Sequence, residues 1–205
     1  IHEGGHGIYE QNIPDYLEGT GLNVAASMAI HESQSRFYEN IIGRSKSFCG
    51  YLYEEAKKEF PNQFEFINEE EFYNTINKVQ PSLIRTEADE LTYSIHVIIR
   101  YEIEKLLIND KIQVADLPRV WNEKYKEYLG IEPTSDKVGV LQDMHWSDGS
   151  FGYFPSYALG NLYGAQMLNE MVKDIPNIYD EIATGDLSSV YEWLKENVHE
   201  YANLY

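Results

Sequence analysis

Residues 1–11 read IHEGGHGIYEQ and contain the pattern His-Glu-x-x-His. On an α-helix the side chains of His2 and His6 stand one turn apart and face the same way. Two imidazoles placed in this way can share one Zn²⁺ ion, and Glu3 beside them can take a proton from a water molecule on that ion. A zinc peptidase of this kind needs a third protein ligand and keeps the fourth position open. The remaining residues must therefore supply one more ligand.

A candidate for the third ligand lies in residues 31–36, which read HESQSR. Glu32 follows His6 by 26 residues (32 − 6 = 26), which is long enough for a turn and an antiparallel return of the chain. A carboxylate from a second helix would complete a His₂Glu zinc site. Alternatively, Glu32 pairs with Arg36 at i, i+4 on its own helix. Because two imidazoles already stand at the required spacing, we favour the ligand.

The spacing of apolar residues predicts a mainly α fold. The clearest helical stripe lies in residues 92–109. Gly130 is expected to end a later helix, over residues 120–128. Residues 81–91 could form a loop or a short strand, so the fold has at most one small β element, near Ile84. Residues 131–152 have the composition of a loop. The expected helices cover residues 1–11, 20–43, 45–60, 69–79, 92–109, 120–128, 154–174, a short stretch around Tyr179, and 187–198.

Composition excludes several classes of partner. The net charge of -18 would repel nucleic acid and anionic membrane surfaces. The sequence has no long apolar run and no signal peptide. Its one cysteine, Cys49, cannot form an internal disulfide, which favours a reducing compartment. No repeat or linker divides the 205 residues, so residues 1–205 are expected to form a single helical catalytic portion.

Four motifs occur in one order along the chain and carry a specific resemblance. They are HEGGH (residues 2–6), HESQSR (31–36), IRTEAD (84–89) and GVLQDMHW (139–146). Together they resemble the motifs of the thermostable carboxypeptidase, or carboxypeptidase Taq, family of zinc metallopeptidases. The resemblance extends from Ile1 to at least Trp146.

The resemblance implies a multi-helix zincin-like fold of the gluzincin type. Such proteins are dimeric, cytoplasmic enzymes of roughly twice this length that remove C-terminal amino acids from peptides. Motif matching then assigns a role to each matched side chain. His2, His6 and Glu32 would be the metal ligands, Glu3 the general base, Arg85 a ligand of the substrate's terminal carboxylate, and His145 a hydrogen-bond partner of the substrate or intermediate.

The chemistry of single residues supports these roles and leaves alternatives. The planar fork of Arg85 suits a carboxylate, although Asp89 could occupy it instead. Tyr153 and Tyr157 could join His145 as donors to an oxyanion, or could serve only in packing. Gln142 and Asp143 could orient His145 or the metal ligands, or could cap the next turn.

The other histidines and the cysteine are expected to have structural roles. His31 lies next to a proposed ligand and is expected to support the metal site or the fold. His96 lies among apolar residues and is expected in the core, whereas His199, near the end of the sequence, is expected at the surface. Cys49 is expected to be a small buried apolar residue.

The sequence predicts a metal-dependent carboxypeptidase that acts on peptides with a free C-terminal carboxylate. It begins without Met, and its first proposed ligand is the second residue. Because helix ends fray, we expect this chain to be the later part of a longer protein. The family resemblance implies that the longer protein is a homodimer. The metal is expected to be Zn²⁺, with Co²⁺ as the alternative. The alternative functions are a related gluzincin that cuts internally or at the amino end, and an inactive helical fragment or interaction module.

Overall fold

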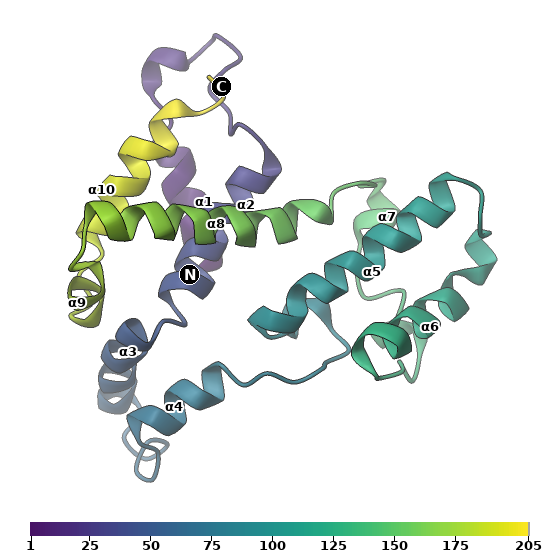
Figure 1. Ribbon diagram of the computed structural model, residues 1–205, viewed down its shortest axis with the longest axis horizontal. Coiled ribbons are helices and arrows are strands. Elements are labelled where there is room, and N and C mark those ends of the chain that lie inside the picture. Colours follow the sequence, from purple (N-terminus) through teal and green to yellow (C-terminus); the bar gives the residue numbers. More distant parts are fainter. Residues whose placement is uncertain (205) are drawn as a thin grey trace. The chain divides into compact units, whose positions relative to one another are not determined.

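The computed structural model describes residues 1–204, and within them the chain forms helices and loops but no strand (Figure 1). The mainly α fold predicted from the sequence is confirmed. No helix in this described part is both long and apolar enough to cross a lipid bilayer. The α-helices are α1 (His2–Gln11), α2 (Met28–Arg36), α3 (Lys46–Glu59), α4 (Glu69–Ile76), α5 (Glu90–Ile108), α6 (Leu117–Leu129), α7 (His145–Asp148), α8 (Pro155–Asp174), α9 (Ile178–Ala183) and α10 (Ser188–Asn197).

Short helices of other types lie in the connections. The segment near Ile84, for which the sequence allowed a strand, forms the 3-10 helix η3 (Arg85–Glu87), and the residues that flank it, Ile84 and Ala88, are extended. A π-helical stretch, η2 (Phe37–Ile42), continues directly from α2. The other 3-10 helices are η1 (Asp15–Leu17), η4 (Val114–Asp116), η5 (Asp136–Val138) and η6 (His199–Tyr201).

The described residues divide into two compact units. Unit 1 comprises residues 1–77 and 159–204, and unit 2 comprises residues 78–158. That residues 1–205 act as one catalytic portion stays a prediction, because it concerns how both units work together.

In unit 1, α2 begins later than the sequence pattern indicated. The hydroxyl of Ser27 accepts a hydrogen bond from the backbone N–H of Ile30 and caps the helix, so α2 starts at Met28 rather than near Thr20. Gly21, in the preceding loop, has a φ of +78°, which an α-helix does not accommodate. The helix predicted for residues 20–43 is therefore wrong in its first eight residues, and residues 37–42 within it are π-helical.

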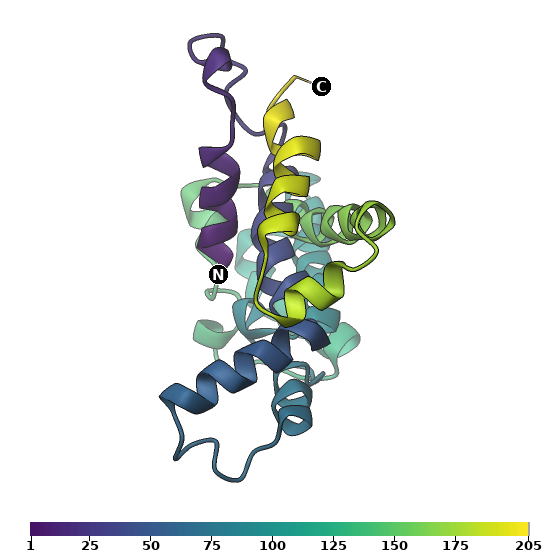
Figure 2. The ribbon, with the colours of Figure 1, turned by 90° about the vertical axis from the view of Figure 1, so that its left-hand side faces the viewer.

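Helices α1 and α2 run alongside each other at a contact that only glycine permits (Figures 1 and 2). A Cβ atom on Gly5 would lie 2.5 Å from the carbonyl oxygen of Gln34 and 2.6 Å from the Cα of Ser35. By contrast, a Cβ on Gly4 or Gly7 would meet nothing within 4 Å. The close backbone approach predicted for the glycine-rich helix is confirmed at Gly5 alone.

The core of unit 1 joins η2 to the last helices of the chain, α8, α9 and α10. Cys49 on α3 is fully buried, as expected for a small apolar residue. The buried members of this core are Phe37, Tyr38, Ile42, Met171, Ile178, Ile182, Val190 and Leu194.

In unit 2, α5 packs on α6 through a separate core. The carboxylate of Asp89 accepts hydrogen bonds from the N–H groups of Leu91 and Thr92 and so caps α5. Gly130, with a φ of +70°, ends α6 as predicted. The buried members of this core are Ile99, Ile103, Val120, Trp121, Tyr125 and Leu129.

Two histidines are buried in the neutral form. His96, in unit 2, is fully buried, as expected for a core residue, and its Nδ1 is 3.0 Å from the hydroxyl of Tyr125. His199 was expected at the surface but is fully buried, because η6 folds back so that its Nε2 lies 2.8 Å from Oε1 of Gln34 on α2. Burial lowers the pKa of each imidazole to about 4, in His96 with help from the nearby charge of Arg100.

We expect His199 to make unit 1 less stable in acid. Its pKa is about 6.5 in an unfolded chain and about 4 in the fold, so its contribution is complete above pH 6.5 and is lost as the pH falls towards 4. At pH 5 the stability lost relative to neutral pH amounts to about 2 kcal/mol. We expect His199→Gln, whose amide can still donate to Gln34, to remove that part of the pH dependence. Urea unfolding of both proteins in a chelator at pH 7.5 and pH 5 measures it, and an unchanged difference between the two pH values would contradict it.

Candidate metal centre and a buried arginine network

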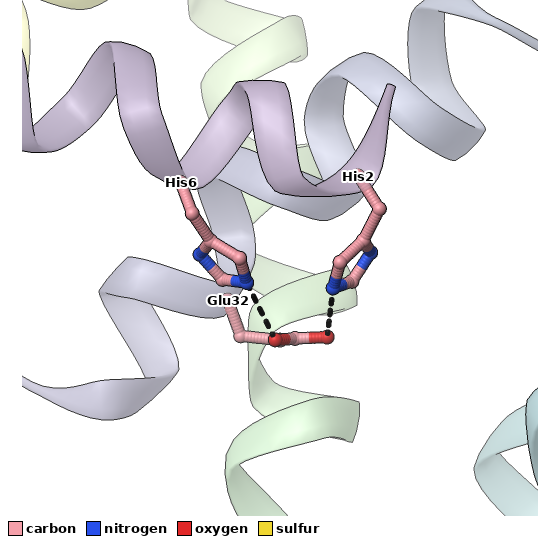
Figure 3. Close-up of side chains that lie close together, drawn as sticks. All are labelled: His2, His6 and Glu32. Atoms are coloured by element: carbon pink, nitrogen blue, oxygen red, sulfur yellow. Dashed lines mark ion pairs between the residues drawn. The ribbon is translucent and has the colours of Figure 1, made fainter.

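Three side chains of unit 1 converge on one point. The imidazoles of His2 and His6 project from the same side of α1 towards the carboxylate of Glu32 on α2 (Figure 3). Nε2 of His2 is 3.9 Å from Oε1 of Glu32, and Nε2 of His6 is 3.5 Å from Oε2. One ligand atom from each residue lies within 4.8 Å of the other two. The structure thus brings together the three residues that the sequence proposed as ligands.

These donors fit a small divalent cation. Zn²⁺ bonds of about 2.0–2.1 Å in a tetrahedron place neighbouring ligand atoms about 3.3–3.4 Å apart. The separations of 3.5 and 3.9 Å are close to that spacing. The side chains of His2 and His6 keep 30% and 22% of their accessible surface, whereas that of Glu32 keeps 4%, so the site is open on the imidazole side. A two-imidazole, one-carboxylate set with an open side is the arrangement of catalytic zinc sites.

The second nitrogen of each imidazole also has a partner. Nδ1 of His2 lies 2.7 Å from Oε2 of Glu39 on η2. This hydrogen bond raises the pKa of His2 and lowers that of Glu39. Nδ1 of His6 lies 2.6 Å from Nδ1 of His31, and burial lowers the pKa of His6. Both rings can therefore present Nε2 to a cation while Nδ1 is held.

Glu32 pairs with Arg36, which the sequence offered as the alternative to a ligand role. Nε of Arg36 donates to Oε1 of Glu32 at 3.0 Å, and Nη1 of Arg36 donates to Oε2 of Glu39 at 3.2 Å. The same carboxylate faces the two imidazoles. On its other side α8 passes so closely that a Cβ on Gly160 would lie 3.0 Å from Cγ of Glu32. The carboxylate is consequently fixed from two sides.

Glu3 lies on α1, between His2 and His6 in the sequence, and is exposed to solvent. Its carboxylate contributes to the electrostatic surroundings of His6. Its role as general base stays a prediction.

In unit 2, Arg85 is buried and its fork is held by Asp143. Nε and Nη2 of Arg85 donate to Oδ1 of Asp143 at 3.0 and 2.8 Å, and Nη1 donates to the hydroxyl of Tyr93 at 2.8 Å. Only 5% of Arg85 is exposed. Its partner is therefore Asp143 rather than Asp89, which caps α5.

A second arginine, Arg100, completes this network and was missed in the sequence. It is fully buried, and it donates to Oδ2 of Asp143 at 2.6 Å and to Oε1 of Gln142 at 2.8 Å. The available signal was its position within the apolar stripe of α5, beside Ile99 and Ile103, because an arginine there needs a buried acceptor. Gln142 and Asp143 thus contact arginines, and the amide of Gln142 also donates to the carbonyl oxygens of Val138 and Gly139.

The arginine network carries an excess of positive charge. Burial works to raise the pKa of Asp143, but Arg100 and Arg85 outweigh burial and lower it. Two guanidinium groups therefore share one carboxylate in a buried environment. Such a cluster is favourable for a further anionic group.

His145 lies beside both candidate tyrosines. Its Nε2 is 2.9 Å from the hydroxyl of Tyr157, and its ring packs 4.3 Å from that of Phe154 and 5.6 Å from that of Tyr153. Burial, with the charge of Arg85, lowers its pKa, so the imidazole is neutral near pH 7. Nδ1 of His145 is buried without a hydrogen-bond partner in residues 1–204. The ring of Tyr157 also lies 4.6 Å from Cζ of Arg85, so unit 2 gathers all its predicted site residues.

A His-Glu-x-x-His helix completed by a carboxylate from a neighbouring helix is the pattern of the His₂Glu metallopeptidases. The profile of the carboxypeptidase Taq (M32) metallopeptidase family matches residues 1–205. The chain belongs to this family.

Known relatives agree with this assignment along the chain. Carboxypeptidase 1 of Bacillus subtilis (strain 168) is 52% identical over 199 residues, which are 97% of this chain and 40% of the relative. Thermostable carboxypeptidase 1 of Thermus thermophilus is 41% identical, over 97% of this chain and 39% of its own length. A structure of Pyrococcus furiosus carboxypeptidase, described as Apo-Mg, superposes with a TM-score of 0.94 at 40% identity and covers 100% of this chain. The chain spans 41% of that structure's length, and so about two-fifths of the relatives.

Proposed function

We propose that this protein is a zinc-dependent metallocarboxypeptidase that hydrolyses the last peptide bond of peptides with a free C-terminal carboxylate. The convergence of His2, His6 and Glu32 on one point is the observation that carries the proposal. Membership of a metallopeptidase family supports a divalent cation there. Two imidazoles and one carboxylate favour Zn²⁺ over harder cations, and Co²⁺ accepts the same donors.

Glu3 is proposed to move the proton of the reaction. A bound divalent cation would supply Lewis acidity, which polarises the scissile carbonyl and acidifies a water molecule. The exposed carboxylate of Glu3 accepts a proton from the attacking water and passes it to the departing amine. Hydrogen bonds at Nδ1 of both imidazoles leave Nε2 as the nitrogen that can bind a cation and direct it towards Glu32.

The residues of unit 2 are proposed to bind the substrate. Arg85 is the candidate for recognising the terminal carboxylate, and the excess positive charge that it shares with Arg100 supports this role. Gln142 and Asp143 position both guanidinium groups. His145, Tyr153 and Tyr157 are the candidate donors to the oxyanion that develops on the scissile carbonyl.

We also propose a cytoplasmic homodimer that binds neither nucleic acid nor membranes. The single buried thiol and the acidic surface support these proposals. The family resemblance supports the dimer.

Metal removal tests the proposed function. We expect a blocked dipeptide with a free carboxylate to be cleaved by the zinc-loaded protein and not by the chelated one, with recovery when Zn²⁺ is restored. The same dipeptide as a C-terminal amide should react much more slowly, because Arg85 then lacks an anion to bind. A ninhydrin assay measures both rates, through the amino acid released from the acid and the amino acid amide released from the amide. Equal rates for acid and amide would contradict an exopeptidase.

The Arg85→Ala variant separates the alternatives. In a carboxypeptidase it should abolish the preference for the acid over the amide, whereas a gluzincin that cuts internally or at the amino end has no such preference to lose. Thermal unfolding of the variant shows whether unit 2 tolerates the loss of the Asp143 pair. Failure to take up any divalent cation would instead indicate an inactive helical module.

A further inference from the structure

We infer that His31 and Glu10 are positioning residues for His6, and that they form a hydrogen-bond relay that keeps the imidazole proton of His6 on Nδ1. The inference rests on the proposed metal site. Nδ1 of His6 is 2.6 Å from Nδ1 of His31, and Nε2 of His31 is 2.7 Å from Oε1 of Glu10. Three side chains from α1 and α2 are thereby joined in one line that ends at a carboxylate.

The order of donors and acceptors in this line is fixed by its two ends. The carboxylate of Glu10 can only accept, so Nε2 of His31 carries a proton and donates it. With its ring proton on Nε2, His31 has a lone pair on Nδ1, and this nitrogen accepts from Nδ1–H of His6. This leaves Nε2 of His6 without a proton, and that nitrogen faces Glu32 at 3.5 Å. The relay therefore selects the tautomer of His6 that a cation needs.

Packing holds the middle ring of the relay. The side chain of His31 is only 15% exposed, and its ring lies 5.4 Å from that of the fully buried Tyr9 and 4.6 Å from that of His6. Glu10 is 55% exposed at its side chain and serves as the solvated end. His31 also precedes Glu32 on α2, so one turn of this helix supplies a ligand and the support for another.

The two imidazoles are consequently supported in different ways. His2 contacts the carboxylate of Glu39 directly, whereas the imidazole of His31 lies between His6 and the carboxylate of Glu10. A direct carboxylate makes an imidazole a stronger base than a neutral acceptor does. We therefore assign His31 a positioning role, setting the tautomer and direction of His6.

The tautomer can be measured without metal or substrate. We expect ¹⁵N-histidine NMR of the chelated protein near pH 8 to show His6 protonated on Nδ1, with the signal assigned by its loss in His6→Gln. In His31→Leu we expect His6 to shift towards the Nε2–H form that free imidazole prefers. Zn²⁺ affinity, measured by competition with a chromophoric chelator, should fall about 10- to 100-fold.

Three further variants separate positioning from a merely structural role. His31→Gln keeps an acceptor for His6 and a donor for Glu10, so it should restore most of the affinity and the Nδ1–H form. Glu10→Ala should lower the affinity less than His31→Leu, and Glu18→Ala, which removes another exposed carboxylate, should leave it unchanged.

A wild-type His6 protonated on Nε2 would overturn the inference, as would unchanged Zn²⁺ affinity in His31→Leu. If the wild-type protein bound no divalent cation but His6 still showed the Nδ1–H tautomer, the relay would stand and the proposed function would fail.

Discussion

Glu3→Gln is expected to lower the rate of peptide hydrolysis by on the order of 10²–10⁴-fold while the protein keeps its metal. The substitution preserves the size of the side chain and leaves His2, His6 and Glu32 in place. An amide cannot accept the proton of the attacking water, so the loss should appear in kcat. Because Glu3 is exposed and lies outside both cores, thermal stability should change little.

The measurement pairs steady-state kinetics with metal analysis of the same sample. Glu18→Gln, which also neutralises an exposed carboxylate in unit 1, should retain activity and serves as the matched control. Turnover of Glu3→Gln at the wild-type rate would rule out Glu3 as the base. Loss of metal together with activity would instead show that Glu3 supports the site and not the proton transfer.

The helical fold of the chain and the grouping of His2, His6 and Glu32 could be predicted from the sequence because both depend mainly on short spacings. His2 and His6 lie one turn apart, and any helix places them on one face. Glu32 needed only a second helix returning beside the first, and α2 provides it. Local chemistry also determined the end of α6 at Gly130.

The parts that escaped prediction depend on contacts distant in sequence. The burial of His199 depends on Gln34, 165 residues away, and local composition near the C-terminal end gives no sign of it. Arg100 owes its place to Asp143, 43 residues further on, so only its position on an apolar stripe hinted at a buried partner. The start of α2 depended on which of several small polar residues would act as the cap, and Ser27 does so.

Gly5→Ala is expected to weaken the metal site although Gly5 binds nothing. The new methyl group would lie 2.5 Å from the carbonyl oxygen of Gln34 and 2.6 Å from the Cα of Ser35, both of which are backbone atoms that no rotamer change can move away. Helices α1 and α2 must then separate. Overpacking of this kind costs about 1–3 kcal/mol or more, which exceeds the gain of up to about 1 kcal/mol from alanine's helix propensity.

Separating the helices should move the proposed metal ligands apart, because α1 carries both imidazoles and α2 carries the carboxylate. Metal sites tolerate ligand displacements of only about 0.2 Å, so Zn²⁺ affinity should fall by more than about tenfold. Gly4→Ala is the matched control: its methyl group meets nothing within 4 Å, so it should stabilise α1 by about 0.5–1 kcal/mol and leave Zn²⁺ affinity unchanged. Urea unfolding without metal and chelator competition with Zn²⁺ measure the two effects separately. If Gly5→Ala matched Gly4→Ala in both, close contact of these two backbones would not be what sets the distance between the imidazoles and Glu32.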